Sequence, residues 1–63
     1  MFRVGNKLEC IYSKEALLTK RKVYVAELVW ANRVQVTNDA GEQVIYSNRR
    51  FEEIVKKYTG EDA

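Results

Sequence analysis

The spacing of apolar side chains changes once along this sequence, and that change constrains the fold more than any other feature. Up to about Tyr46, apolar residues recur at every second position, as in Leu8, Cys10 and Tyr12. After that point they recur at every third or fourth position. A period of two is typical of a strand with one buried face, and a period near 3.6 is typical of an amphipathic helix. The pattern therefore predicts a mainly β fold that ends in one C-terminal helix.

Four segments have the composition of strands and are separated by turn signals. The second is the strongest, and because both of its faces are apolar we expect each face to be covered by other parts of the molecule. In the third, Val34 and Val36 are expected to point inward. The four segments are residues 7–12, 22–30, 33–37 and 42–46.

The connections between these segments differ in length and character. Residues 13–21 form either a short helix with Ser13 as its N-cap or a long loop, and the loop is favoured because so short a helix is marginal by itself. Ala31-Asn32 reads as a tight turn. Residues 38–41 read as a hairpin loop in which Gly41 supplies a positive φ.

Residues 49–58, approximately, are expected to form the C-terminal helix. Acidic residues precede lysines at a spacing of four, which favours a helix and suits its dipole. Ser47 or Asn48 would cap the start, and Gly60 would end it. The apolar stripe of this helix would consist of Phe51, Ile54, Val55 and Tyr58.

The expected architecture is one domain over residues 1–60, with residues 61–63 as a frayed tail. Its order is β-loop-β-β-β-α, and the short consecutive strands are expected to curl into a small SH3-like antiparallel barrel, in which either Val4 or the residues near Phe51 supply a fifth, very short strand. A chain of 63 residues is long enough for one domain and buries only a thin core.

Several functional classes are disfavoured by what the sequence lacks. There is no histidine, Cys10 is the single cysteine, and the three glycines form no phosphate-binding loop. No group of residues has the spacing of a metal site. We therefore expect no catalytic residue, no metal, no cofactor and no enzymatic activity. The single cysteine excludes an internal disulfide, and no apolar run is long enough to span a bilayer, so a cytoplasmic protein without a membrane partner is expected.

Several short segments together form a recognisable pattern: residues 7–11, 18–24 and 34–41, followed by Tyr46 and Arg50-Phe51. This pattern resembles that of the small SH3-like proteins that bacteriophages and prophages often encode. The similarity spans about residues 5–51 and implies a fold and a setting in a bacterial host cell more than an activity. At one position the family pattern has glycine where this chain has Arg21, which would be strained if the position requires a positive φ.

The favoured function is a non-enzymatic binding module, an accessory protein of a phage that docks on a host or phage protein. Trp30 at a hairpin end, beside Asn32 and Arg33, is the kind of aromatic and arginine anchor that interfaces favour. The full set of expected contact residues is Tyr24, Trp30, Asn32, Arg33 and Tyr58.

Two alternatives remain open from the sequence. The first is a nucleic-acid-binding barrel without sequence preference, in which aromatic rings would stack on bases. Its basic residues would be Lys20, Arg21, Lys22, Arg49 and Arg50. The second is a structural protein that associates with itself, as a homodimer, through exposed sheet edges.

Overall fold

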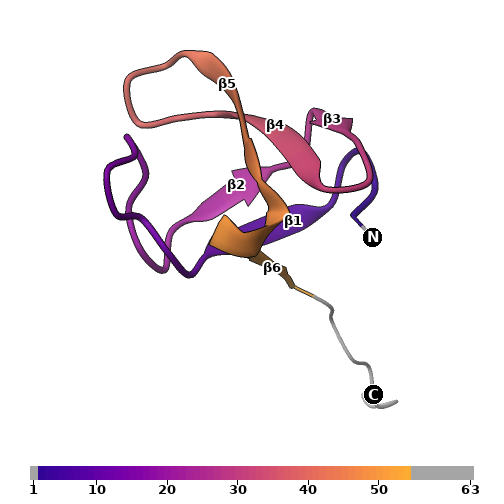
Figure 1. Cartoon of the computed structure of the whole chain (residues 1–63), viewed down its shortest axis with the longest axis horizontal. Helices are drawn as coiled ribbons and strands as arrows, with labels where there is room; N and C mark the ends of the chain where they lie inside the picture. Colours follow the sequence, from indigo (N-terminus) through magenta and orange to yellow (C-terminus); the bar gives the residue numbers. More distant parts are fainter. Residues whose placement is uncertain (1, 55–63) are drawn as a thin grey trace, which may run out of the picture.

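The structure is a computed structural model that describes residues 2–54, and these form two small antiparallel sheets around a shared core (Figure 1). One sheet has the strand order β2-β1-β6 and the other has the order β3-β4-β5. The strands are β1 (Lys7–Cys10), β2 (Val23–Val25), β3 (Leu28–Val29), β4 (Arg33–Thr37), β5 (Gln43–Ser47) and β6 (Phe51–Glu53), with a 3₁₀ turn η1 (Asn48–Arg50) before β6.

The expected closed barrel is wrong. Within residues 2–54 the two sheets are not joined into one continuous hydrogen-bonded ring, so each keeps two edge strands. The strands are too short for closure, since β3 has two residues and β2 and β6 have three each. The mainly β character and the antiparallel pairing are as the alternating pattern predicted.

The long strand expected over residues 22–30 is two strands in different sheets. Glu27 and Leu28 both lie opposite Gln35, because Leu28 is its ladder partner and the Glu27 N–H donates to the Gln35 carbonyl oxygen at 2.9 Å. Such a bulge places an extra residue in one strand and bends the chain. The bend carries the chain from one sheet to the other, and it leaves Val25 and Leu28 exposed, so the expectation of two covered faces is wrong.

The C-terminal helix is also wrong over the described part of its range. Residues 48–50 form η1, and the chain then continues as β6, in which Phe51 lies opposite Cys10 and Glu52 lies opposite Glu9 of β1. Phe51 is buried, with its ring edge-on to those of Tyr24 and Tyr46. Ladder pairing and this burial outweigh a local pattern that favours a helix. Val55 and Tyr58, which complete the predicted stripe, lie outside the described residues, as do Gly60 and the predicted tail over 61–63.

Several local predictions are confirmed. Residues 13–21 form a loop, Gly41 has a φ of 79°, and Val34 and Val36 are fully buried. Arg21 has a φ of 77°, so this arginine does adopt the conformation that favours glycine.

Among residues 2–54 no helix is long and apolar enough to cross a membrane.

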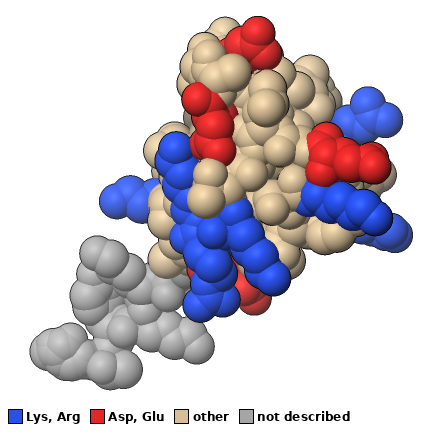
Figure 2. Space-filling model, turned by 90° about the vertical axis from the view of Figure 1, so that its left-hand side faces the viewer, with Lys and Arg blue, Asp and Glu red and all other residues tan. Residues whose placement is uncertain are grey.

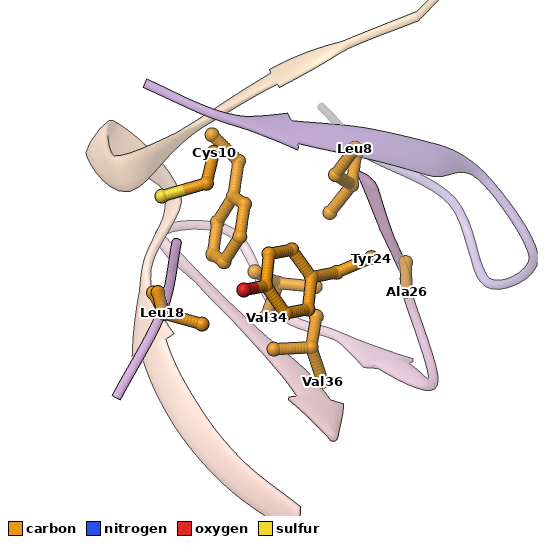
Figure 3. Packing of buried hydrophobic residues seen from close by; sticks show 8 residues of the cluster. Leu8, Cys10, Leu18, Tyr24, Ala26, Val34 and Val36 are labelled. Atoms are coloured by element: carbon orange, nitrogen blue, oxygen red, sulfur yellow. The ribbon is translucent and has the colours of Figure 1, made fainter. Parts of the chain in front are cut away.

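The core lies between the two sheets (Figure 3). Each sheet contributes the side chains of alternate strand positions, as expected when one face is buried. Leu18 reaches the core from the loop, which anchors that loop on the sheets. The buried apolar residues are Leu8, Cys10, Leu18, Tyr24, Ala26, Val34, Val36 and Phe51.

Candidate functional site

Side chains from the 13–21 loop and from β2 converge on one carboxylate, that of Asp39 in the loop between β4 and β5. Asp39 accepts hydrogen bonds from the Thr19 hydroxyl at 2.6 Å and from the Tyr24 hydroxyl at 2.7 Å. The Lys22 ammonium group donates to the same carboxylate at 3.0 Å. These donors, led by Thr19, lower the pKa of Asp39 to about 2. The carboxylate is therefore ionised throughout the physiological pH range.

The same network ties the 13–21 loop to the hairpin loop. The Tyr24 hydroxyl accepts from the Thr19 N–H at 2.8 Å, and the Asp39 N–H donates to the Leu17 carbonyl at 2.8 Å. Asn38 accepts from two backbone N–H groups of its own turn, those of Ala40 and Glu42. The polar groups of these two loops are therefore bonded to one another within the molecule.

Tyr24 belongs to this network and not to the molecular surface. Only 5% of Tyr24 is exposed, and burial raises the pKa of its hydroxyl. Its ring packs against that of Phe51. We therefore leave Tyr24 out of the candidate surface, although the sequence had grouped it with the contact residues.

An apolar strip lies on the outer face of the β3-β4-β5 sheet. Leu28, Trp30 and Ile45 are 48%, 45% and 47% exposed, respectively. Leu28 and Ile45 flank Gln35 in one row across the sheet, because both are ladder partners of that residue. Exposed apolar side chains that occur singly are ordinary, but three on one small sheet face form a patch suited to contact with another molecule.

A pocket opens at one end of this strip. It is lined by Trp30, Ala31, Asn32, Arg33 and Ile45. The hairpin turn that carries it is held in place, since the Trp30 N–H donates to the Arg33 carbonyl at 2.8 Å and the Asn48 N–H donates to the Asn32 carbonyl at 3.0 Å. Among residues 2–54 the Arg33 side chain has no carboxylate partner. The pocket thus combines an apolar wall with an unpaired guanidinium group at its edge.

Polar groups bound the strip at its other end. The Glu27 carboxylate accepts hydrogen bonds from Thr37 and Gln35, and these, led by Thr37, lower its pKa. Glu27 is half-buried and its oxygens are occupied, so it is a fixed border of the strip. A ligand on this face would meet a fixed anion at one end and the Arg33 cation at the other.

The basic residues that were predicted to bind nucleic acid differ in whether their side chains already have partners within the molecule. Arg21 pairs with Glu9 at 3.1 Å, and Lys22 is held by Asp39. Arg50 donates to the carbonyls of Tyr12 and Lys14, and its guanidinium lies over the Tyr12 ring at 5.3 Å. Lys20 and Arg49 are exposed. Figure 2 shows Lys and Arg side chains in several groups spread over the face in view, with acidic side chains between them.

Side chains suited to binding a metal do not gather in the described part of the chain. No cluster of three or more Cys, Asp or Glu residues with metal-binding geometry occurs among residues 2–54. Cys10 is buried and free. The absence of catalysis, metal and cofactor stays a prediction from the sequence.

The structure brings together three of the five expected contact residues and adds two that sequence reasoning missed. Trp30, Asn32 and Arg33 share one pocket, and Tyr58 lies outside the described residues. Leu28 and Ile45 were missed as surface residues. Ile45 carried a signal, since it alternates with the inward Val44 and Tyr46, but the position of Leu28 depends on the bulge. Comparison with known proteins gave no match among family models, curated proteins or solved structures.

Proposed function

We propose that this chain is a small protein-binding module whose docking surface is the pocket of Trp30, Ala31, Asn32, Arg33 and Ile45 with the adjoining Leu28. The observation that carries the proposal is the exposed apolar strip beside Arg33, which has no carboxylate partner among residues 2–54. Interfaces are enriched in tryptophan and arginine at their energetic centres. The backbone hydrogen bonds of the hairpin that carries Trp30 support the proposal, because a turn that is already ordered loses less conformational entropy on binding.

The chemistry of the pocket indicates what kind of partner it fits. A large apolar side chain would lie against Trp30 and Ile45, and a neighbouring carboxylate would pair with Arg33. Glu27 at the far end of the strip disfavours a second carboxylate there. The partner is therefore a protein segment in which an apolar residue is adjacent to Asp or Glu.

Selection from a display library of random peptides tests this recognition. The immobilised protein should enrich peptides in which a large apolar residue stands next to Asp or Glu. Trp30→Ser should weaken binding of a selected peptide by about thirtyfold, the change that corresponds to a hot spot of about 2 kcal/mol. Arg33→Glu should weaken the binding of an acidic peptide more than Trp30→Ser does, because the substitution inverts the charge at the pocket.

Matched variants on the other sheet serve as controls. Val25 is an exposed apolar residue of β2, and Lys7 is an exposed cation of β1. Val25→Ser and Lys7→Glu should leave the affinity unchanged. Enrichment of basic peptides, or equal loss of binding in the control variants, would contradict the proposal.

The alternative hypothesis assigns nucleic-acid binding to Lys20, Arg21, Lys22, Arg49 and Arg50. It has less support, because Arg21, Lys22 and Arg50 are engaged within the molecule. A phosphate-binding surface predicts affinity for oligonucleotides that falls steeply as salt is added. We expect no measurable shift of an oligonucleotide even at low salt, and a salt-dependent shift that is lost on neutralising Lys20 and Arg49 would favour the alternative.

The biological setting follows from the family resemblance alone. We propose an accessory protein of a bacteriophage or prophage that acts in the cytoplasm of its bacterial host, with a host or phage protein as the partner. Thr19, Lys22 and Asp39, which lie in the segments that carry the resemblance, form one network in this protein. The test is to identify proteins captured from infected cells and to measure the affinity of each purified candidate for the wild-type protein and for Trp30→Ser.

A further inference from the structure

The four edge strands of the two sheets differ in how well they are protected from pairing with another strand. Exposed edges are usually shortened, charged, bulged or interrupted by proline. In this protein β3 has two residues, β2 has three and follows Lys22, and β6 carries Glu52 and Glu53. By contrast β5, Gln-Val-Ile-Tyr-Ser, has five residues, no charge, no proline and no glycine.

The outer edge of β5 presents unpaired backbone groups. The Asn38 N–H donates to the Glu42 carbonyl at 2.8 Å, which fixes the phase of the β4–β5 ladder. Because hydrogen bonding alternates along an antiparallel strand, the backbone groups of Val44 and Tyr46 face β4 and those of Gln43, Ile45 and Ser47 face outward. Within residues 2–54 no strand pairs with that edge, and the outward-facing residues are exposed.

We propose that this edge binds a second copy of the chain, β5 against β5, antiparallel and centred on Ile45. This register places Gln43 opposite Ser47 of the second copy, and every outward N–H and C=O of both strands then has a partner. The contact is isologous, so it closes as a dimer and does not grow into a fibre.

Charge and side-chain chemistry favour a second copy as the occupant. Glu42 precedes β5 and Arg49 lies in η1, just after it, so antiparallel pairing places the acidic start of one copy's strand next to the basic turn that follows the other copy's strand. Within the strand no like charges oppose each other, and the amide of Gln43 meets the hydroxyl of Ser47. An uncharged edge with an acidic start and a basic end is complementary to itself.

The dimer would join the two β3-β4-β5 sheets into one continuous sheet. The two Ile45 side chains would meet at the centre of the outer face of this continuous sheet, and one Trp30 would lie on each side of them. This inference goes beyond the proposed docking function, because the pairing uses backbone groups of β5. Ile45 is the residue of β5 that the two proposed surfaces share, whereas Trp30 belongs to the pocket and the N–H of Gln43 belongs to the edge.

Sedimentation equilibrium of the full chain tests the dimer. The expected mass rises from 7.4 kDa toward twice that value as the concentration is raised. Gln43→Pro removes an outward N–H, and by symmetry it does so at both ends of the interface, so it should weaken the dimer at least about tenfold. Gln43→Ala keeps the N–H and removes the same side chain, and it should retain more of the dimer than Gln43→Pro.

A second pair of variants covers the case in which Gln43→Pro does not fold. Ile45→Lys places like charges directly opposite across the two-fold axis and should leave only monomer, while Ile45→Thr should keep the dimer. A wild-type protein that stays monomeric at every concentration, or a dimer insensitive to both Gln43→Pro and Ile45→Lys, would overturn the proposal. Trp30→Ser should lose peptide binding and keep the dimer, and Gln43→Pro should do the reverse, so the two proposals fail separately.

Discussion

Asp39 holds the 13–21 loop and the hairpin loop together, and its low pKa makes that role dependent on pH. The folded pKa of about 2 lies below the ordinary value of 3.8, so the unfolded chain binds the proton more readily. The contribution of Asp39 to stability is therefore complete above about pH 4 and is lost as the pH falls toward 2.

We expect the melting temperature of the wild-type protein to fall between pH 4 and pH 2 more steeply than that of Asp39→Asn. At neutral pH the variant should be the less stable protein, because it loses an ionised acceptor for Thr19, Tyr24 and Lys22. Glu42→Gln, in the same hairpin, is the control and should keep the wild-type pH profile. Parallel profiles for wild type and Asp39→Asn, measured by circular dichroism, would show that Asp39 is not the titrating group.

Arg21 stores backbone strain that a glycine would relieve. Its φ of 77° costs a residue with a Cβ on the order of 1 kcal/mol. Its exposed ion pair with Glu9 contributes less than that. We expect Arg21→Gly to raise the free energy of unfolding in urea by roughly 0.5–1 kcal/mol, and Arg21→Ala to leave it unchanged or slightly lower. Destabilisation by Arg21→Gly equal to that of Arg21→Ala would contradict the assigned strain.

A substitution in β6, the last described strand, should have opposite effects on stability depending on whether these residues form a strand or a helix. Glu52 lies directly opposite Glu9 in the β1–β6 ladder, which places like charges across from each other. Glu52→Thr removes this opposition and raises β-propensity, so it should stabilise the protein by about 0.2–1 kcal/mol. Threonine in a helix at this position would destabilise it instead.

Glu53→Thr is the matched control for this substitution. Glu53 lies opposite Leu8, so the same change in propensity occurs there without removal of a like-charged neighbour. The gain in the free energy of unfolding should therefore be larger for Glu52→Thr than for Glu53→Thr. Destabilisation by both would contradict the strand assignment.

An element could be predicted from the sequence where residues close in the chain determine its structure. It could not be predicted where contacts with distant residues determine it. The alternation of Val34 and Val36, and Gly41 after Asn38-Asp39, are local features, and the β4–β5 hairpin could be derived from them. The division of residues 22–30 could not, because the bulge forms only against Gln35 of another strand. The helical spacing after Tyr46 was misleading, since Phe51 belongs to the core between the sheets.

The residues of the candidate site also divide into those grouped by closeness in sequence and those brought together only by the fold. Trp30, Asn32 and Arg33 are close in sequence, so a hairpin turn was enough to group them. Ile45 reaches that pocket from β5, which required the ladder register and therefore the structure. Tyr24 and Trp30 would share one face of an uninterrupted strand over residues 22–30, whereas the observed bend leaves Tyr24 in the core and Trp30 on the outer sheet face.

Across the molecule, groups that maintain the fold are separate from groups that are available for binding. Thr19, Tyr24 and Asp39 bind one another between the loops, while Trp30 lies on the outer sheet face. Tyr24→Phe should therefore lower the free energy of unfolding by about 1 kcal/mol, through loss of a hydroxyl that both donates and accepts. Trp30→Ser should change it less than truncation of a core aromatic does, which costs about 3–5 kcal/mol. Unfolding of Trp30→Ser at room temperature would show that Trp30 is a core residue.

The most direct test of this separation is the change of backbone amide chemical shifts in a ¹⁵N-labelled sample as a library-selected peptide is added. The account predicts shifts at Trp30, Asn32, Arg33 and Ile45, and none at Thr19, Lys22, Tyr24 and Asp39. Shifts centred on the Asp39 network, with the amides around Trp30 unchanged, would contradict it.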